Sequence, residues 1–306
     1  MITASNLSKF YGKFPALENF SFTISENGVV ALLGLNGAGK TTTIRILTGF
    51  LIPGGGSVTI DGISLFENPR QAKKKIGYLP ENPPLYEDLT VYEYLEFVHR
   101  IKQYPEEKKE FDIDDACRKT GLLSMKDRVI GTLSLGYRKR TGIAQAILGS
   151  PPLVIMDEPV SGLDPKQIIE IRNLLKELGK FSTVIISSHI LSEVYKTCDR
   201  FILIKDGRLI RQFSHEELES MMKKISGIQI GLCGDLREKI EQCLGQVCQP
   251  VFLKEDESSF YYRLPLEDSR ENRNRVIDLI RSSGLDLVQI TKPEVTLEDI
   301  FMEMTR

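Results

Sequence analysis

The feature that most constrains this chain is a glycine-rich stretch placed between an apolar run and a helical pattern. Five apolar residues, Val29–Leu33, lead into Gly34-Leu-Asn-Gly-Ala-Gly-Lys-Thr-Thr42, and Ile44 and Leu47 follow at helical spacing. A strand, a GxxxxGK[ST] loop and a helix in this order are the context in which the pattern wraps phosphate groups. The sequence therefore predicts a phosphate-binding loop at the end of a buried strand.

The residues of this loop have distinct predicted tasks. Its glycines allow backbone N–H groups to curl around phosphate oxygens, and the N-terminus of the following helix adds a favourable dipole. Lys40 is expected to reach the β- and γ-phosphates, and the Thr41 hydroxyl to hold Mg²⁺. The predicted cofactor-binding residues of the loop are Asn36, Gly37, Ala38, Gly39, Lys40, Thr41 and Thr42.

A second apolar run ends in two adjacent acids. Leu153–Met156 has the composition of a buried strand, and Asp157 and Glu158 follow it. Beside a phosphate loop, Asp157 is predicted to bind Mg²⁺ and Glu158 to polarise an attacking water as general base. The alternative, two solvated acids that simply end a strand, is less favoured in a chain that has a phosphate loop.

Strand and helix signals alternate over the first two thirds of the chain. Helical periodicity dominates from about residue 85 to 150, beginning at the capping-box pattern Thr90-Val-Tyr-Glu93. The three glycines at 54–56 are interpreted as a flexible connection. Runs bounded by turn residues predict strands at 21–25, 29–33, 57–60, 63–65, 153–156, 184–186, 201–204 and 208–210.

This order favours an α/β fold, a mostly parallel sheet with helices on both faces and a helical insertion at 85–150. The residue pattern changes near residue 215, where a charged stretch leads into short runs of alternating apolar and polar residues at 228–232 and 260–264. Helical segments at 274–281 and 296–304 follow. These patterns predict a main domain at 1–215 and a small α+β domain at 216–306.

Composition excludes several classes of protein. The formal net charge is −2 at pH 7, so no global field favours nucleic acid. No apolar run approaches the roughly 18 residues of a membrane span, and the N-terminus lacks the pattern of a secretory signal. The five cysteines form no CxxC pair, which favours a reducing cytosol over a disulfide framework or a zinc site.

The motifs together resemble the ATP-binding subunits of ABC transporters over about residues 1–215. The resemblance implies a P-loop ATPase domain with an antiparallel β subdomain and a helical subdomain. Its elements occur in the family's order: Leu7–Gly12 with an adenine-stacking aromatic, the phosphate loop, Gly77–Glu81 at the Q-loop, Leu133–Tyr137 at the signature motif, Asp157-Glu158, Ser161–Asp164 at the D-loop, and Ser188-His189 at the switch histidine.

The resemblance also implies roles for individual residues. Tyr11 would stack on adenine, and His189 would reach the γ-phosphate. Ser134 and the Gly136 backbone would contact the γ-phosphate held by the opposite subunit, and Asp164 lies in the D-loop that contributes to the nucleotide sites. The implied cofactors are ATP and Mg²⁺.

Two positions depart from the family pattern. Glu81 stands where glutamine is usual; its oxygens can still coordinate Mg²⁺ or orient water, but it adds negative charge beside the triphosphate. Leu135 stands between Ser134 and Gly136, where the signature motif of the family has a further glycine. Since only its backbone would face the nucleotide, a side chain is tolerated there if it points away, which favours a subfamily variant over a decayed motif.

The resemblance implies the motor subunit of an ABC transporter that works in export, as a homodimer or heterodimer with separate integral membrane permease subunits. Such a subunit is cytoplasmic and peripheral on the inner face of the membrane. The alternative is a soluble or regulatory ABC-type ATPase that is not coupled to transport. The basic runs at 73–75 and 138–140 are interpreted as solvated faces, so nucleic acid is not expected as a partner.

Overall fold

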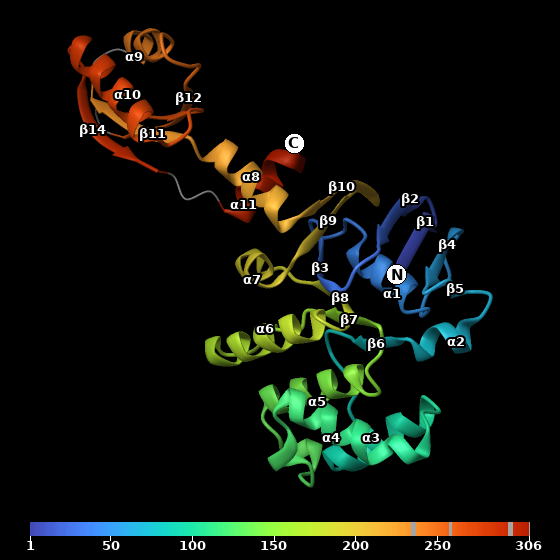
Figure 1. Ribbon diagram of the computed structural model, residues 1–306. Coiled ribbons are helices and arrows are strands. Elements are labelled where there is room, and N and C mark those ends of the chain that lie inside the picture. Colours follow the sequence, from blue (N-terminus) through green and yellow to red (C-terminus); the bar gives the residue numbers. More distant parts are fainter. Residues whose placement is uncertain (234–236, 257–258, 293–295, 306) are drawn as a thin grey trace. The chain divides into compact units, whose positions relative to one another are not determined.

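The computed structural model describes residues 1–233, 237–256, 259–292 and 296–305. It divides into two compact units, Met1–His215 and Glu216–Arg306, which are described separately (Figure 1). In the part of the chain so described, no helix is both long and apolar enough to cross a bilayer.

An antiparallel sheet begins the first unit. Its strand order is β2-β1-β4-β5. The strands are β1 (Ile2–Tyr11), β2 (Phe14–Ile24), β4 (Gly55–Ile60) and β5 (Ile63–Ser64). The interpretation of residues 54–56 as a flexible connection is wrong for Gly55 and Gly56, which begin β4. Gly56 is required there because its φ is 87° and a Cβ would lie 2.4 Å from the Ser5 carbonyl oxygen.

The central sheet of the first unit has six strands in the order β10-β9-β3-β8-β7-β6. All neighbours pair in parallel except β9 and β10, which are antiparallel and joined by a turn at Asp206-Gly207. The strands are β3 (Gly28–Leu33), β6 (Ile76–Leu79), β7 (Leu153–Asp157), β8 (Thr183–Ser187), β9 (Arg200–Lys205) and β10 (Arg208–Ser214).

Both faces of this sheet are covered, as the continuous apolar runs predict. Val30 and Leu32 belong to a core cluster shared with the antiparallel sheet and with α1 (Lys40–Leu47). On the opposite face Val29 packs against Gly179 of α6, where a Cβ would come within 3.0 Å of its methyl carbon. The remaining helices beside the sheet are α2 (Pro69–Lys74), α6 (Pro165–Gly179) and α7 (Leu191–Thr197).

The helical subdomain lies between β6 and β7 in the chain. Its first helix begins with the predicted capping box: the Thr90 hydroxyl accepts from the Glu93 N–H, and the Glu93 carboxylate accepts from the Thr90 N–H. The helices are α3 (Val91–Ile101), α4 (Lys109–Thr120) and α5 (Leu135–Ile147), with short 3₁₀ turns at Glu106–Lys108, Leu123–Met125 and Ile130–Thr132.

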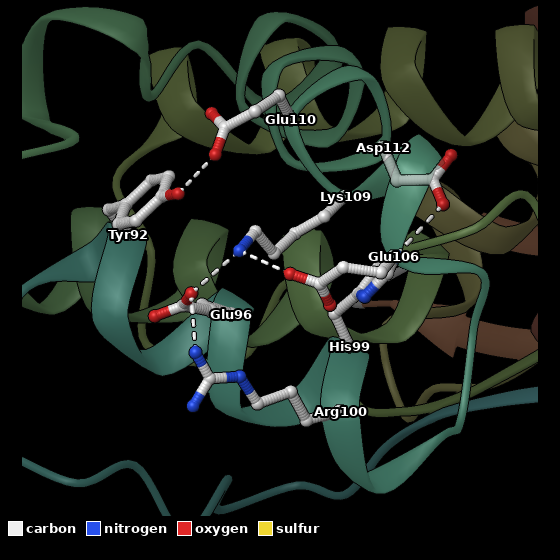
Figure 2. Close-up of polar contacts among 8 residues, drawn as sticks. All are labelled: Tyr92, Glu96, His99, Arg100, Glu106, Lys109, Glu110 and Asp112. Atoms are coloured by element: carbon white, nitrogen blue, oxygen red, sulfur yellow. Dashed lines mark hydrogen bonds and ion pairs between the residues drawn. The ribbon is translucent and has the colours of Figure 1, made fainter.

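Polar contacts join α3 to the segment that leads into α4 (Figure 2). The Lys109 ammonium lies 3.0 Å from a Glu96 carboxylate oxygen and 2.6 Å from one of Glu106. The Tyr92 hydroxyl donates to Glu110, and this hydrogen bond raises the pKa of Tyr92 to about 12. These contacts fix the register of the two helices, although ion pairs this close to solvent each stabilise by less than about 1 kcal/mol.

His99 is the buried exception in this group. Its side chain is 0% exposed, its ring packs edge-on against Tyr104 at 5.5 Å, and its Nε2 lies 3.3 Å from an Asp112 oxygen (Figure 2). Neither ring nitrogen makes a hydrogen bond within the described residues. The ring therefore contributes to stability mainly through packing between α3 and α4.

We expect His99→Ala to lower the free energy of unfolding by about 2 kcal/mol, because it opens a cavity under Tyr104. Urea denaturation followed by circular dichroism measures this. Arg100→Ala, one position along and on the exposed side of α3, should change stability by less than about 0.5 kcal/mol. Equal effects of the two substitutions would contradict a packing role for His99.

The second unit confirms the predicted α+β class. Strands and helices alternate as β11-α9-β12-β13-α10-β14, and the antiparallel sheet has the order β12-β13-β11-β14, a ferredoxin-like arrangement. The apolar residues of α9 and α10 share one core cluster with the sheet. The elements are α8 (His215–Ser226), β11 (Ile228–Cys233), α9 (Arg237–Leu244), β12 (Val251–Asp256), β13 (Ser259–Leu264), α10 (Arg270–Ser282), β14 (Asp286–Thr291) and α11 (Leu297–Thr305).

Candidate functional site

A cleft of about 780 Å³ opens at the carboxyl ends of the central strands, where ligands of parallel sheets bind. The end of β1, the loop between β3 and α1, and the residues following β6, β7 and β8 form its walls. The lining residues are Tyr11, Phe14, Ala16, Asn36, Gly37, Gly39, Lys40, Thr41, Thr42, Arg45, Tyr78, Pro80, Glu81, Asn82, Asp157, Glu158, Ser187 and His189.

The loop between β3 and α1 is shaped by close backbone packing. Gly39 has a φ of 110°, and a Cβ there would lie 2.6 Å from the Ala16 carbonyl oxygen. Only glycine fits this position, which precedes the helix N-terminus. Ala38, by contrast, is buried and does not line the cleft; its N–H donates to the Leu35 carbonyl at 3.1 Å.

Lys40 is the cation of the loop. Its Nζ donates to the carbonyls of Gly34 at 2.7 Å and Leu35 at 3.1 Å. Burial lowers the pKa of Lys40, while the nearby charges of Glu158 and Asp157 raise it. The amine is therefore desolvated and directed into the loop, where it could bind a phosphate oxygen.

Asp157 ends β7 beside Ser187 of β8, because these two residues are partners in the parallel register. The Ser187 hydroxyl donates to one Asp157 oxygen. Asp157 and Thr41 both line the cleft. A carboxylate and a hydroxyl on one wall are oxygen ligands of the kind Mg²⁺ takes, together with water and phosphate oxygens.

Glu158 and His189 form the edge of the cleft beyond the strand ends. Glu158 adopts a left-handed backbone, with φ 50°, which takes the chain out of the strand. Its carboxylate is 13% exposed, and its Oε2 lies 2.9 Å from Nδ1 of His189, which is 65% exposed. Oε2 has almost no solvent-exposed surface and accepts no hydrogen bond from the described residues.

Two aromatic side chains border the opposite end of the cleft. Tyr11 and Phe14 are register partners across a two-residue turn, and both are about half exposed or more. Sequence reasoning identified Tyr11 and missed Phe14. The pairing of residues across a short hairpin turn is the signal that could have found it.

Glu81 follows β6 and faces two clefts, the one already described and a second of about 430 Å³ that Leu135 and Lys139 also line. Lys139 is only 4% exposed and donates to the Glu81 backbone carbonyl at 3.0 Å. The interpretation of residues 138–140 as a solvated face is therefore wrong for Lys139. Its pKa is lowered by burial, and the charges of Glu81, Glu158 and Asp157 raise it.

Besides Ala38, the structure places three predicted residues outside the first cleft. Ser134 is the N-cap of α5, with no side-chain capping hydrogen bond, and Gly136 packs against the Gln167 side chain. Asp164 caps α6 by accepting from the Gln167 N–H at 2.9 Å. One chain therefore does not bring Ser134, Gly136 and Asp164 to the phosphate loop.

Arg45, Tyr78, Asn82 and Ser187 also line the cleft and were not predicted as functional. Asn82 directly follows the predicted residue Glu81 in the sequence, and Ser187 is the strand-register partner of the predicted residue Asp157. Arg45 lies on α1, the helix that follows the phosphate loop, and Tyr78 lies in the Gly77–Glu81 segment, but neither has a role in the predicted site.

Comparison with known proteins agrees with this geometry. The family model described as ABC transporter matches residues 17–161. The chain is 32% identical to the uncharacterized ABC transporter ATP-binding protein YxlF of Bacillus subtilis over 99% of both chains. It is 32% identical to the bacitracin transport ATP-binding protein BcrA of Bacillus licheniformis over 99% of this chain and 97% of that protein.

Solved structures share the fold of the first unit. The ATP-binding subunit of an ABC transporter aligns with a TM-score of 0.66 and 31% identity, over 72% of this chain and 92% of the other. A dimeric ATP-binding cassette in a post-hydrolysis state, bound to ADP and phosphate, aligns with a TM-score of 0.63 and 27% identity, over 70% of this chain and 99% of the other.

The strand–loop–helix, the acids after β7 and these similarities define one class of protein. The chain belongs to the ABC transporter family, as an ATP-binding subunit with ATPase activity. The predicted P-loop ATPase fold is confirmed.

Proposed function

We propose that this chain is the motor subunit of an ABC exporter, with residues 1–215 as the ATPase domain, 85–150 as its helical subdomain and 216–306 as an accessory domain. Two copies, or one copy and a paralogue, would enclose two ATP molecules. Closure on ATP and opening after hydrolysis would move separate permease subunits in the membrane, with the motor peripheral on the cytoplasmic face.

The observation that carries this proposal is the division of the predicted site within one chain. Phosphate-loop residues and Glu158 line one cleft, whereas Ser134 and Gly136 lie outside it. A free serine hydroxyl at a helix N-terminus is suited to bind a phosphate, so a second chain supplying it would complete the site. The similar cassette bound to ADP and phosphate is dimeric, which supports this arrangement.

In the proposed reaction, Tyr11 and Phe14 stack on adenine, and backbone N–H groups of Asn36, Gly37 and Gly39 hold phosphate oxygens together with Thr42. Lys40 exchanges its two carbonyl partners for β- and γ-phosphate oxygens. Ala38, which is buried, would contribute only through the shape of the loop. The family's D-loop role is proposed for Asp164 through its capping of α6, which fixes the segment before that helix.

The hydrolytic step would centre on Glu158. Its carboxylate would accept a proton from the water that attacks the γ-phosphorus, and the phosphorus–oxygen bond to ADP would break. His189, 2.9 Å from Oε2, would orient the carboxylate and approach the γ-phosphate. Thr41, Asp157 and Glu81 would hold Mg²⁺, which when bound neutralises charge on the β- and γ-phosphates.

The export direction is proposed from the printed names of relatives. BcrA is a bacitracin transport ATP-binding protein, and a lantibiotic transport ATP-binding protein of Streptococcus pyogenes is 37% identical over 72% of this chain and 94% of that protein. A permease partner is proposed because cbiO1 from Clostridium perfringens, whose structure is similar, is part of the ABC transporter complex cbiONQ.

Capture from detergent-solubilised membranes of the source cells tests the coupling to transport. Tagged full-length protein should recover an integral membrane protein with several predicted spans, and Mg-ATP should alter the recovered amount. Recovery of only water-soluble partners would favour the alternative, an ATPase that is not coupled to transport.

Leu135, which departs from the signature motif of the family, gives a separate prediction. Leu135 is 61% exposed, and its side chain lies against Gly162 rather than in the first cleft. We expect Leu135→Gly to keep the ATPase rate within about threefold of wild type, because only backbone would face the nucleotide. Ser134→Ala should lower the rate more than tenfold by removing a hydroxyl that binds the γ-phosphate. A large gain in Leu135→Gly would instead identify the leucine as a brake.

A further inference from the structure

A cavity of about 450 Å³ lies between α2 and the end of α3, in the first unit. None of its lining residues lines the nucleotide cleft. These residues are Arg70, Lys73, Lys74, Ile101, Lys102 and Gln103. Four of the six are cations and none is an acid.

The positive charge of this cavity is not neutralised by the protein. Among the described residues, no carboxylate lies within ion-pair distance of Arg70, Lys73, Lys74 or Lys102. The adjacent Lys75 differs, since it pairs with Asp61 at 3.0 Å. Lys73 and Lys74 are exposed, in agreement with the interpretation of residues 73–75 as a solvated face, and they also line the cavity.

Two of the lysine stems are held in place. The Lys102 Nζ donates to the carbonyls of Lys73 at 3.0 Å and Ile76 at 2.6 Å, which leaves one of its three N–H groups unused. The Lys73 stem lies close against Gly49, where a Cβ would come within 2.7 Å of the Lys73 Cε. Lys73 and Lys102 are therefore held at the cavity by contacts within the protein.

Like charges held together in this way raise the free energy of the protein, and a bound anion would lower it. Burial and the charge of Lys73 together lower the pKa of Lys102 to about 8, with no acid acting in the opposite direction. An anion in the cavity would satisfy the remaining donor of Lys102 and the charges of Arg70, Lys73 and Lys74.

We propose that this cavity is a binding site for a phosphate-bearing ligand. Phosphate matches the donors, because a guanidinium binds it through two parallel hydrogen bonds and ammonium groups bind its remaining oxygens. The cavity is larger than a phosphate group, so it leaves room for a further part of the ligand. Ile101, 63% exposed at the rim, provides an apolar contact for that part.

The test uses full-length protein and the double substitution Lys73→Gln/Lys74→Gln. Its matched control is Lys108→Gln/Lys239→Gln, which removes the same charge from two exposed lysines that do not line the cavity. All carry Lys40→Ala in the binding experiments, so that the phosphate loop contributes little. The probes are inorganic pyrophosphate, by calorimetry, and vesicles of phosphatidylcholine with or without phosphatidylglycerol, by sedimentation.

We expect the cavity substitution to weaken binding to at least one probe by on the order of 10- to 30-fold and the control by less than threefold. Loss of pyrophosphate binding identifies a soluble phosphate compound, and loss confined to phosphatidylglycerol vesicles identifies a phospholipid headgroup. Equal losses in both double variants, binding of neither probe, or equally tight binding of polyglutamate would overturn the proposal.

Folding of the variant is checked with Lys40 intact. Its kcat and KM for ATP should stay within twofold of wild type, because no cavity residue contacts the nucleotide cleft. If the double variant does not fold, the single exposed substitution Arg70→Gln replaces it and must weaken binding of the same probe at least threefold for the proposal to stand.

Discussion

Glu158→Gln is expected to lower ATP turnover by about three orders of magnitude while changing ATP affinity by less than about threefold. The amide keeps the size of the side chain but cannot take a proton from water, and general-base catalysis contributes roughly 10²- to 10⁴-fold. Single-turnover hydrolysis and equilibrium binding of a fluorescent ATP analogue measure the two quantities separately.

Glu177→Gln is the matched control, because it makes the same chemical change on an exposed face of α6, where Glu177 forms an ion pair with Lys180. Its turnover should equal that of wild type. If Glu158→Gln retained more than about a third of wild-type turnover, the assignment of Glu158 as general base would be wrong, and His189 or Glu81 would have to be tested in its place.

The second large effect concerns stability. Gly77 of β6 lies directly against α5, and a Cβ there would come within 1.7 Å of the Ala146 carbonyl oxygen. We expect Gly77→Ala to lower the free energy of unfolding by about 3 kcal/mol or more, because backbone on both sides must move. Urea denaturation monitored by circular dichroism measures the loss, and reduced recovery of folded protein is expected.

Gly55→Ala provides the comparison for this substitution. Gly55 also lies in a strand, but no atom lies within 4 Å of the position a Cβ would take. Its unfolding midpoint should not fall. An unchanged midpoint in Gly77→Ala would show that α5 does not pack on β6 as closely as described.

The phosphate-loop strand and helix and the capping box at Thr90 could be predicted because each depends on neighbouring residues. Thr90 and Glu93 reach each other within one helical turn, and Asp206-Gly207 sets a turn by itself. The last helix also begins with hydrogen bonds between residues close in sequence. The Thr296 N–H donates to the Asp299 carboxylate, and the Thr296 hydroxyl accepts from the Asp299 N–H.

Elements without a strong local pattern were missed. β12 and β14 are edge strands with mostly exposed residues, so they lack the alternation that marks a half-buried strand. The charged stretch after residue 215 forms α8, because glutamate and lysine favour helix and Leu218 is buried. The secondary structure of these segments depends on tertiary contacts rather than on a local sequence pattern.

Contacts between segments that are far apart in the sequence could not be predicted either. Burial of Lys139 against Glu81 depends on how α5 packs beside the end of β6, 58 positions away in the chain. The pairing of Asp157 with Ser187 depends on the register of two parallel strands. The basic cavity likewise requires α2 and the end of α3 to meet, which no run of residues reveals.

The central claim is that a second chain completes each nucleotide site, and the mass of the Glu158→Gln protein with Mg-ATP tests it most directly. Size-exclusion chromatography with light scattering should give one chain, 34.6 kDa, without nucleotide and twice that mass with ATP. Adding Ser134→Ala should return it to the single-chain mass. A single-chain mass at an ATP concentration at which the wild-type protein hydrolyses ATP would contradict the account.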